Sequence, residues 1–215
     1  MRAVMQFVDF PILAHALFCL PSLQEDNLFS GTTPSEIGLL PLKELKLTQN
    51  RLTGSTPAEV AALEGMEEFR LANNRLVGPI ASSIGSMRGL LLLGLNNNVL
   101  TGTMPAALGN LGQLELFLLQ NNALEGAIPS EFGNFKNLNV LDVSGNSRLT
   151  ETIPDELAHL PHLDRANLFN TSITGTVPVG LCSLEDGITV NCSGLTCPND
   201  CQCCCKERAS TNSLG

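Results

Sequence analysis

Apolar residues recur along this chain in one regular pattern. An apolar residue is followed by two free positions, an apolar residue, one free position, a third apolar residue, two more free positions and, in all copies but the last, Asn. Self-similarity at a fixed period of about 20 to 50 residues indicates an array of stacked repeats. The pattern starts at intervals of 24 or 25 residues, at Leu42, Met66, Leu90, Leu114, Leu138 and Leu163.

The end of each pattern alternates between apolar and free positions, which is the period of a β-strand. In the first of these copies, Leu45 and Leu47 are expected to point inward, with Lys46 pointing outward between them. One such strand buries too little apolar surface to be stable alone, so neighbouring copies must stack into a parallel sheet over a continuous core. We therefore predict a repeat array over residues 23–181, with about seven repeats of 24 residues.

The second half of most copies carries the phrase Leu-x-Gly-x-(Ile, Met or Val)-Pro, as in residues 100–105 and, with Ile in first place, 173–178. This phrase resembles the plant-type class of leucine-rich repeats. The resemblance implies an α/β-type leucine-rich repeat solenoid, right-handed, with a parallel β-sheet on the concave face and loops or 3₁₀ turns on the convex face. The class includes receptor-like kinase ectodomains, receptor-like proteins and secreted inhibitor or defence proteins of plants, and similar repeats occur in algae such as diatoms.

The Asn of the pattern forms a column in the predicted stack. An inward-pointing Asn at a turn can bond backbone groups that would otherwise lack partners, in its own repeat and in the neighbouring one. A polar binding site is the alternative, and we assign the column to the scaffold as a structural ladder. Its members are Asn27, Asn50, Asn74, Asn98, Asn122 and Asn146.

The free positions of the strands face the concave surface, and there the copies differ. Four apolar residues are adjacent in the middle of the predicted stack, namely Leu92, Leu116, Leu118 and Val140. An exposed apolar patch with a polar rim marks an interaction site, so we predict that a protein or peptide docks here. Degenerate copies, or an N-terminal segment folded over the patch, are the alternatives. The predicted rim consists of Glu44, Lys46, Glu68, Arg70, Asp142, Arg165, Asn167 and Phe169.

Seven of the eight Cys residues follow the last repeat. Residues 182–205 are predicted to form a Cys-rich C-terminal cap, because a solenoid exposes its core at the last coil unless something covers it. Clustered Cys indicates disulfides in an oxidising compartment, or a thiolate metal site in a reducing one. The zinc alternative lacks His and the usual paired spacing. The disulfide candidates are Cys182, Cys192, Cys197, Cys201, Cys203, Cys204 and Cys205, with Cys19 as a further partner for an odd thiol.

The two ends of the chain are less regular. Residues 1–22 fit either a signal peptide or a degenerate N-terminal cap, and residues 206–215 read as a disordered tail. No stretch reaches the roughly 20 apolar residues that span a bilayer. Asn170 and Asn191 begin triplets of the N-glycosylation type, which matter only in a secreted chain.

The sequence contains few residues that indicate a catalytic site. His159 and His162 lie near Asp155, Glu156 and Asp164, but in a segment that joins two repeats, where solvated polar residues are expected. No phosphate loop, nucleophile elbow or zinc-protease motif is present. We predict neither enzymatic activity nor a cofactor nor a bound metal.

The net charge of −9 argues against nucleic acid and anionic membranes as partners, because both require a positive surface. We therefore expect a non-enzymatic protein-binding module. From the resemblance we expect it to be extracellular, at the cell surface or secreted, and receptor-like in signalling or defence, with a membrane receptor as an associated partner. The alternatives are a secreted inhibitor of a cell-wall hydrolase and a cytosolic scaffold with a metal-binding Cys tail.

Overall fold

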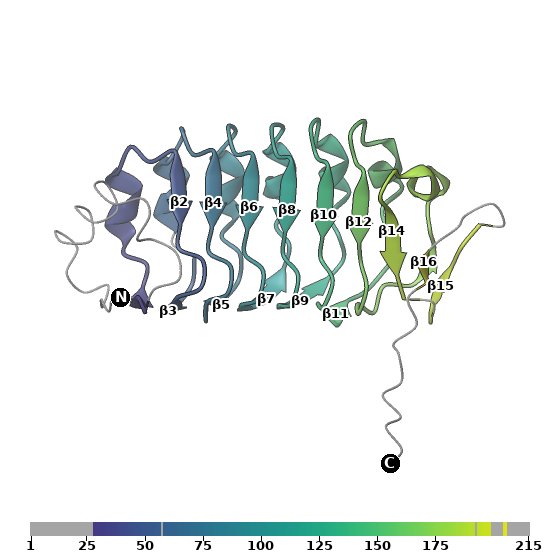
Figure 1. The fold of residues 1–215 in the computed structure, drawn as a ribbon, viewed down its shortest axis with the longest axis horizontal. Coiled ribbons are helices and arrows are strands. Elements are labelled where there is room, and N and C mark those ends of the chain that lie inside the picture. Colours follow the sequence, from purple (N-terminus) through teal and green to yellow (C-terminus); the bar gives the residue numbers. More distant parts are fainter. Residues whose placement is uncertain (1–27, 57, 192, 199–203, 206–215) are drawn as a thin grey trace, which may run out of the picture.

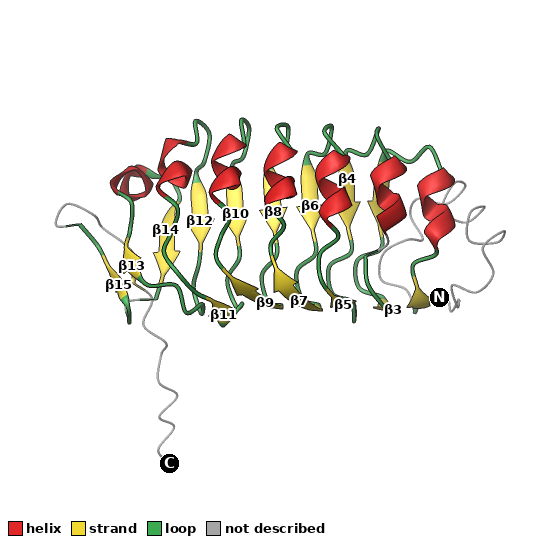
Figure 2. Cartoon of the chain, turned by 180° about the vertical axis from the view of Figure 1, so that it is seen from behind, coloured by secondary structure: helices red, strands yellow, loops and turns green. Residues whose placement is uncertain are grey.

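The computed structural model describes residues 28–56, 58–191, 193–198 and 204–205. Consecutive repeats stack side by side into an elongated array, each repeat placing a strand on one side and a short helix on the other (Figure 1, Figure 2). The leucine-rich repeat solenoid expected from the pattern is thus the observed fold. Residues 1–22, Asn27 and residues 206–215, for which a signal peptide or cap, a ladder position and a tail were predicted, lie outside the described residues.

Within the described ranges the main sheet is parallel and has eight strands, in the order β16-β14-β12-β10-β8-β6-β4-β2. Each repeat pairs with the next in the register that the pattern predicts, so equivalent positions stand side by side. The strands are β2 (Glu44–Lys46), β4 (Glu68–Arg70), β6 (Leu92–Gly94), β8 (Leu116–Leu118), β10 (Val140–Asp142), β12 (Arg165–Asn167), β14 (Gly187–Val190) and β16 (Cys204–Cys205).

Behind the main sheet lies a row of 3₁₀ helices (Figure 2). Six of the seven helices in the described part of the chain begin directly after the Pro of the repeat phrase, and η4 follows Ala81 instead. The ring of Pro fixes φ, and Pro has no N–H to leave unpaired. Among the described residues, no helix has the length and apolar character needed to cross a membrane. The helices are η2 (Ser35–Leu39), η3 (Ala58–Ala62), η4 (Ser82–Ser86), η5 (Ala106–Asn110), η6 (Ser130–Asn134), η7 (Asp155–His159) and η8 (Val179–Ser183).

A second row of short parallel strands runs along one edge of the array, the lower edge in Figure 1 and Figure 2, where the sequence predicted loops and turns only. These lateral strands come from the Leu-x-Gly-x phrase. Gly126 shows why Gly is needed there, because its φ is +78° and an added Cβ would lie 3.1 Å from Cγ2 of Thr103 in the preceding repeat. The strands are β1 (Ser30–Thr32), β3 (Arg51–Thr53), β5 (Val77–Gly78), β7 (Val99–Thr103), β9 (Ala123–Gly126), β11 (Arg148–Leu149), β13 (Gly175–Thr176) and β15 (Leu195–Thr196).

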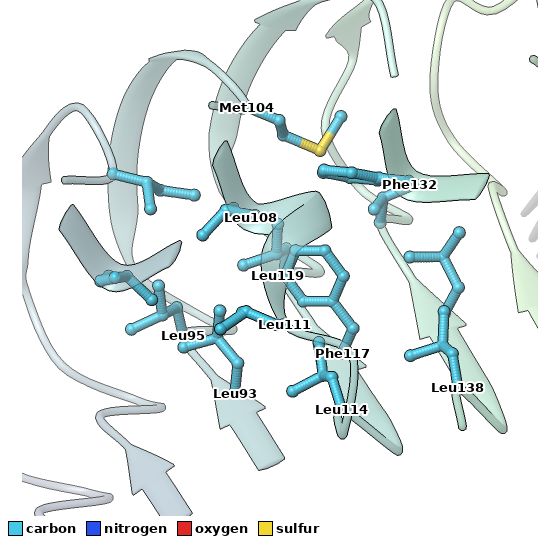
Figure 3. Packing of buried hydrophobic residues seen from close by; sticks show 14 of the residues in the cluster. Leu93, Leu95, Met104, Leu108, Leu111, Leu114, Phe117, Leu119, Phe132 and Leu138 are labelled. Atoms are coloured by element: carbon cyan, nitrogen blue, oxygen red, sulfur yellow. The ribbon is translucent and has the colours of Figure 1, made fainter. Parts of the chain in front are cut away.

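One continuous apolar core fills the space between the main sheet and the helices. Leu45 and Leu47 are fully buried, as their inward positions predicted. In the middle of the array the ring of Phe117 packs edge-on against that of Phe132, with ring centroids 5.4 Å apart (Figure 3). It packs in the same way against Phe135, at 5.8 Å. Because every repeat contributes to this core and contacts mainly its neighbours, stability accumulates along the stack.

The Asn column connects the backbone of consecutive repeats. Oδ1 of Asn74 accepts from the N–H of Leu52 in the preceding repeat at 3.0 Å, and its Nδ2 donates to the carbonyls of Leu47 (2.8 Å) and Leu71 (3.1 Å). Asn98, Asn122 and Asn146 make equivalent bonds, and Asn50 bonds the N–H of Phe29 in the same way; these bonds belong to the scaffold.

The region predicted as the C-terminal cap continues the solenoid. β14 pairs with β12, and β16 pairs with β14, so the main sheet extends past the last repeat. Cys182 and Cys197 are both disulfide-bonded in the structure. The side chain of Cys182 packs against the end of the apolar core, where a cap has to cover it.

Replacing Asn74 by Ala should lower the free energy of unfolding by about 1–3 kcal/mol, because the buried N–H of Leu52 loses its acceptor. The carbonyl of Leu47 still accepts from Nδ2 of Asn50, and that of Leu71 still accepts from Nδ2 of Asn98. These remaining hydrogen bonds limit the loss of stability. Urea denaturation followed by circular dichroism measures the change. The control is Asn134→Ala, at an exposed position of η6. Equal midpoints for the two variants would show that the column is not structural.

Candidate protein-binding surface

The outward positions of the main sheet form two straight columns across the concave face. Strand pairing sets Leu116 between Leu92 and Val140 in the first column. In the second column it sets Leu118 between Gly94 and Asp142. The structure therefore brings together the four apolar residues that the sequence placed side by side.

Three of these residues form what we call the central patch: Leu116, Leu118 and Val140, all half-buried. Leu92 differs, because its side chain is only 8% exposed. Its Cδ2 lies 3.4 Å from the point where a Cβ on Gly94 would stand, so the side chain lies along the strand over the space that this glycine leaves. Leu92 thus supports the patch from one side and offers little surface to a partner.

On the N-terminal side, the predicted rim residues are engaged with one another. Nζ of Lys46 lies 2.6 Å from Glu44 and 3.1 Å from Glu68, and Nε of Arg70 lies 2.9 Å from the same oxygen of Glu68. The hydrogen bond to Glu44 raises the pKa of Lys46 above its usual value, and the same bond lowers the pKa of Glu44. The positive and negative charges on this side therefore largely balance.

On the C-terminal side, the rim is a hydrogen-bond network centred on Asp142. Its Oδ1 accepts from the backbone N–H of Ser144 at 3.0 Å and from the Ser144 hydroxyl at 2.6 Å. Its Oδ2 accepts from Nδ2 of Asn167 at 3.1 Å. Oδ1 of Asn167 in turn accepts from the N–H of Phe169 at 3.2 Å, and Arg165 is paired with Asp186. Ser144 was not among the predicted site residues, because a Ser beyond the strand end carries no signal without its contacts.

The remaining candidate residues lie outside this surface or belong to the scaffold. Asn170 is exposed in a turn. Both amide atoms of Asn191 are engaged, since Oδ1 accepts from the N–H of Asn170 at 2.8 Å and Nδ2 donates to the carbonyl of Thr171 at 2.6 Å. Of the two glycosylation candidates, Asn170 is therefore the more accessible.

His159 and His162 are exposed on the segment that joins two repeats, as expected of solvated residues. Nδ1 of His159 lies 3.1 Å from the carbonyl oxygen of Asp155 within η7. No group of three or more His, Cys, Asp or Glu side chains within the described ranges is arranged to hold a metal ion. An open groove of about 670 Å³ beside η6 and η7 is lined partly by Glu151, Asp155 and Glu156.

Comparison with known proteins agrees with this architecture. The family model described as Leucine Rich Repeat matches residues 137–160. No curated protein matches the chain by sequence. Among solved structures, the ectodomain of the Arabidopsis thaliana receptor kinase GASSHO1/SCHENGEN3, in complex with CASPARIAN STRIP INTEGRITY FACTOR 2, is 34% identical with a TM-score of 0.73, over 80% of this chain and 21% of that one.

Two further Arabidopsis structures are similar. The receptor kinase HAESA, in complex with the peptide hormone IDA and the co-receptor SERK1, is 30% identical with a TM-score of 0.73, over 80% of this chain and 29% of that one. The ectodomain of the receptor kinase SOBIR1 is 35% identical with a TM-score of 0.55, over 58% of this chain and 68% of that one. The chain spans under a third of the GASSHO1 and HAESA chains.

The stacked sheet, the Asn ladder and these matches define a protein-binding scaffold built from repeats. The chain belongs to the plant-type leucine-rich repeat proteins.

Proposed function

We propose that the chain recognises a protein or peptide partner through its concave face, with the central patch at the middle of the contact. The observation that carries this proposal is the set of half-exposed side chains of Leu116, Leu118 and Val140 at positions where the fold needs no apolar residue. The GASSHO1 structure is a complex with CASPARIAN STRIP INTEGRITY FACTOR 2 and the HAESA structure is a complex with a peptide hormone and a co-receptor, which supports the same class of ligand.

The layout of the surface favours binding energetically. Each half-exposed Leu can still gain part of the roughly 1.5–3 kcal/mol that full burial of its side chain is worth. Polar groups surround the patch on both sides, which matches the usual arrangement of a dry apolar centre and a wet rim. Because the rim charges are paired on the N-terminal side, the apolar centre is the part of the face with most to gain from a partner.

The double substitution of Leu116 and Leu118 by Asp should abolish partner capture while the fold is kept, since both side chains point away from the core. The probe is a library of random linear peptides displayed on phage and selected on the full chain. Loss of the central contacts should weaken the selected peptides by about 2 kcal/mol or more, or roughly thirtyfold.

The matched control is the double substitution of Val77 and Val99 by Asp. These valines are paired on the lateral strands β5 and β7, and they are 46% and 52% exposed. The control carries the same added charge on a different face and should bind normally. Peptides that bind the Leu116→Asp, Leu118→Asp variant as tightly as the original chain would show that the patch is not the site.

The compartment is part of the same proposal. We infer an extracellular, receptor-like role in signalling or defence, secreted or at the cell surface in association with a membrane receptor. Two of the matched structures, those of GASSHO1/SCHENGEN3 and SOBIR1, are ectodomains of plant receptor kinases, and Cys182 and Cys197 are disulfide-bonded. An oxidising compartment also gives Asn170 the chance to carry a glycan.

Alkylation of the native protein should leave Cys182 and Cys197 unlabelled before reduction and labelled after it, because disulfide sulfur has no free thiol to react. Peptide mapping by mass spectrometry reads both states, and reduction of the same sample is the internal control. Labelling of both residues without reductant, together with bound zinc, would instead indicate the cytosolic scaffold.

A further inference from the structure

Asp142 stands at the border between the central patch and the C-terminal rim. It follows Val140 by two residues on the same face of β10, and it pairs directly with Leu118 on β8. Its carboxylate is thus next to two of the three residues of the central patch. A partner that covers the patch must also meet this charge.

The Asp142 carboxylate is held in place by uncharged donors. Both of its oxygens accept hydrogen bonds, from Ser144 and from Asn167, and the side chain is half-buried. Among the described residues of the concave face, Glu44 and Glu68 are ion-paired and Asp142 is not. An ionised carboxylate offers about four acceptor positions, and three are used here, so one remains for a further donor.

A second acceptor lies close to this network. Gln120 is two residues beyond Leu118, and the backbone bond from Asn121 to the carbonyl of Ser144 sets Gln120 beside Ser144. Oε1 of Gln120 is buried and has no hydrogen-bond partner among the described residues. The Gln120 side chain as a whole is only half-buried, so a change of rotamer would expose this acceptor to a donor that a partner supplies.

The geometry points to a cationic side chain, Arg or Lys, as the group that binds at Asp142 and Gln120. We infer that the partner is an extended peptide segment that places an apolar side chain on the central patch and this cation within two residues of it. Arg suits the position best, because a guanidinium presents five N–H donors in a fixed plane and can bond a carboxylate and an amide oxygen together. The inference rests on the proposed function and adds the chemistry of the ligand.

The spacing supports a short motif. Side chains on the same face of a strand are about 6.5 Å apart, and equivalent residues of neighbouring strands are about 4.8 Å apart. Val140 is the same-face neighbour of Asp142 along β10, and Leu118 is the residue beside Asp142 on the neighbouring strand β8. An extended peptide lying along the strands or across them would therefore present its apolar and cationic side chains to these groups from neighbouring or next-but-one positions.

Peptides selected from the random library on the full chain should carry Arg or Lys within two positions of an apolar residue. Their binding should weaken roughly 10- to 100-fold on the Asp142→Asn variant, because a charge-assisted hydrogen bond is lost. Asn keeps the size of the side chain, and its Oδ1 can still accept from Ser144, although the bond from Nδ2 of Asn167 is lost because the amide nitrogen at that place only donates. The control is Glu125→Gln on the lateral strand β9, which removes the same charge from an exposed position and should leave binding unchanged.

A change on the peptide side avoids any effect of the substitution on folding. Replacing the Arg of a selected peptide by citrulline, which has nearly the same shape but no charge, should weaken its binding to the original chain by a similar factor. A different result would be that the selected peptides carry no cation, lose binding to the Leu116→Asp, Leu118→Asp variant and bind the Asp142→Asn variant normally. That result would overturn this inference and leave the proposed function standing. Peptides insensitive to both changes would overturn the proposed function itself.

Discussion

Every part of this molecule depends on the satisfaction of backbone groups between one repeat and the next. Each turn that leaves the main sheet would leave buried N–H and carbonyl groups without partners, and the Asn side chain supplies both an acceptor and donors for them. The carbonyl of Leu71 accepts from two amides, that of Asn74 in its own repeat and that of Asn98 in the next. From Asn50 to Asn146 the ladder is therefore continuous, and a repeat inside this range cannot shift without breaking bonds on both of its sides.

The fixed register has a direct consequence for function. Because the ladder and the parallel pairing hold equivalent residues side by side, the free positions of the strands form columns that the core does not constrain. The scaffold residues Leu45 and Phe69 are both buried and could be exchanged for other large apolar residues of similar fit, whereas their neighbours Lys46 and Arg70 face solvent. Side chains alternate along the strand, so one set packs in the core and stabilises the fold while the other set faces outward and is available for contacts with a partner.

The sequence predicted the fold and the place of each surface position, because both follow from a period that can be counted. It did not predict the burial of Leu92, which depends on the missing side chain of Gly94 two residues away. The lateral strands were also missed, because segments of only two to five residues, most of them at a Gly, give no strand signal by themselves. The bonds of Asp142 to Ser144 and Asn167 join two repeats, and no spacing rule in one repeat shows them.

The two halves of the concave face differ in how their charged side chains are paired, so the two ends of the surface are not equivalent for a ligand. On the N-terminal side Glu44 and Lys46 neutralise each other, so a ligand that bonds either one must give up part of an existing ion pair. On the C-terminal side the charge of Asp142 is supported by neutral donors only, and a ligand cation adds attraction without breaking an ion pair. The apolar centre contributes area that any apolar group can use, and so discriminates weakly between ligands. In the binding mode that we propose, discrimination between ligands would arise at the Asp142 end, and the order in which a peptide presents its apolar and cationic residues would decide which way it lies across the strands.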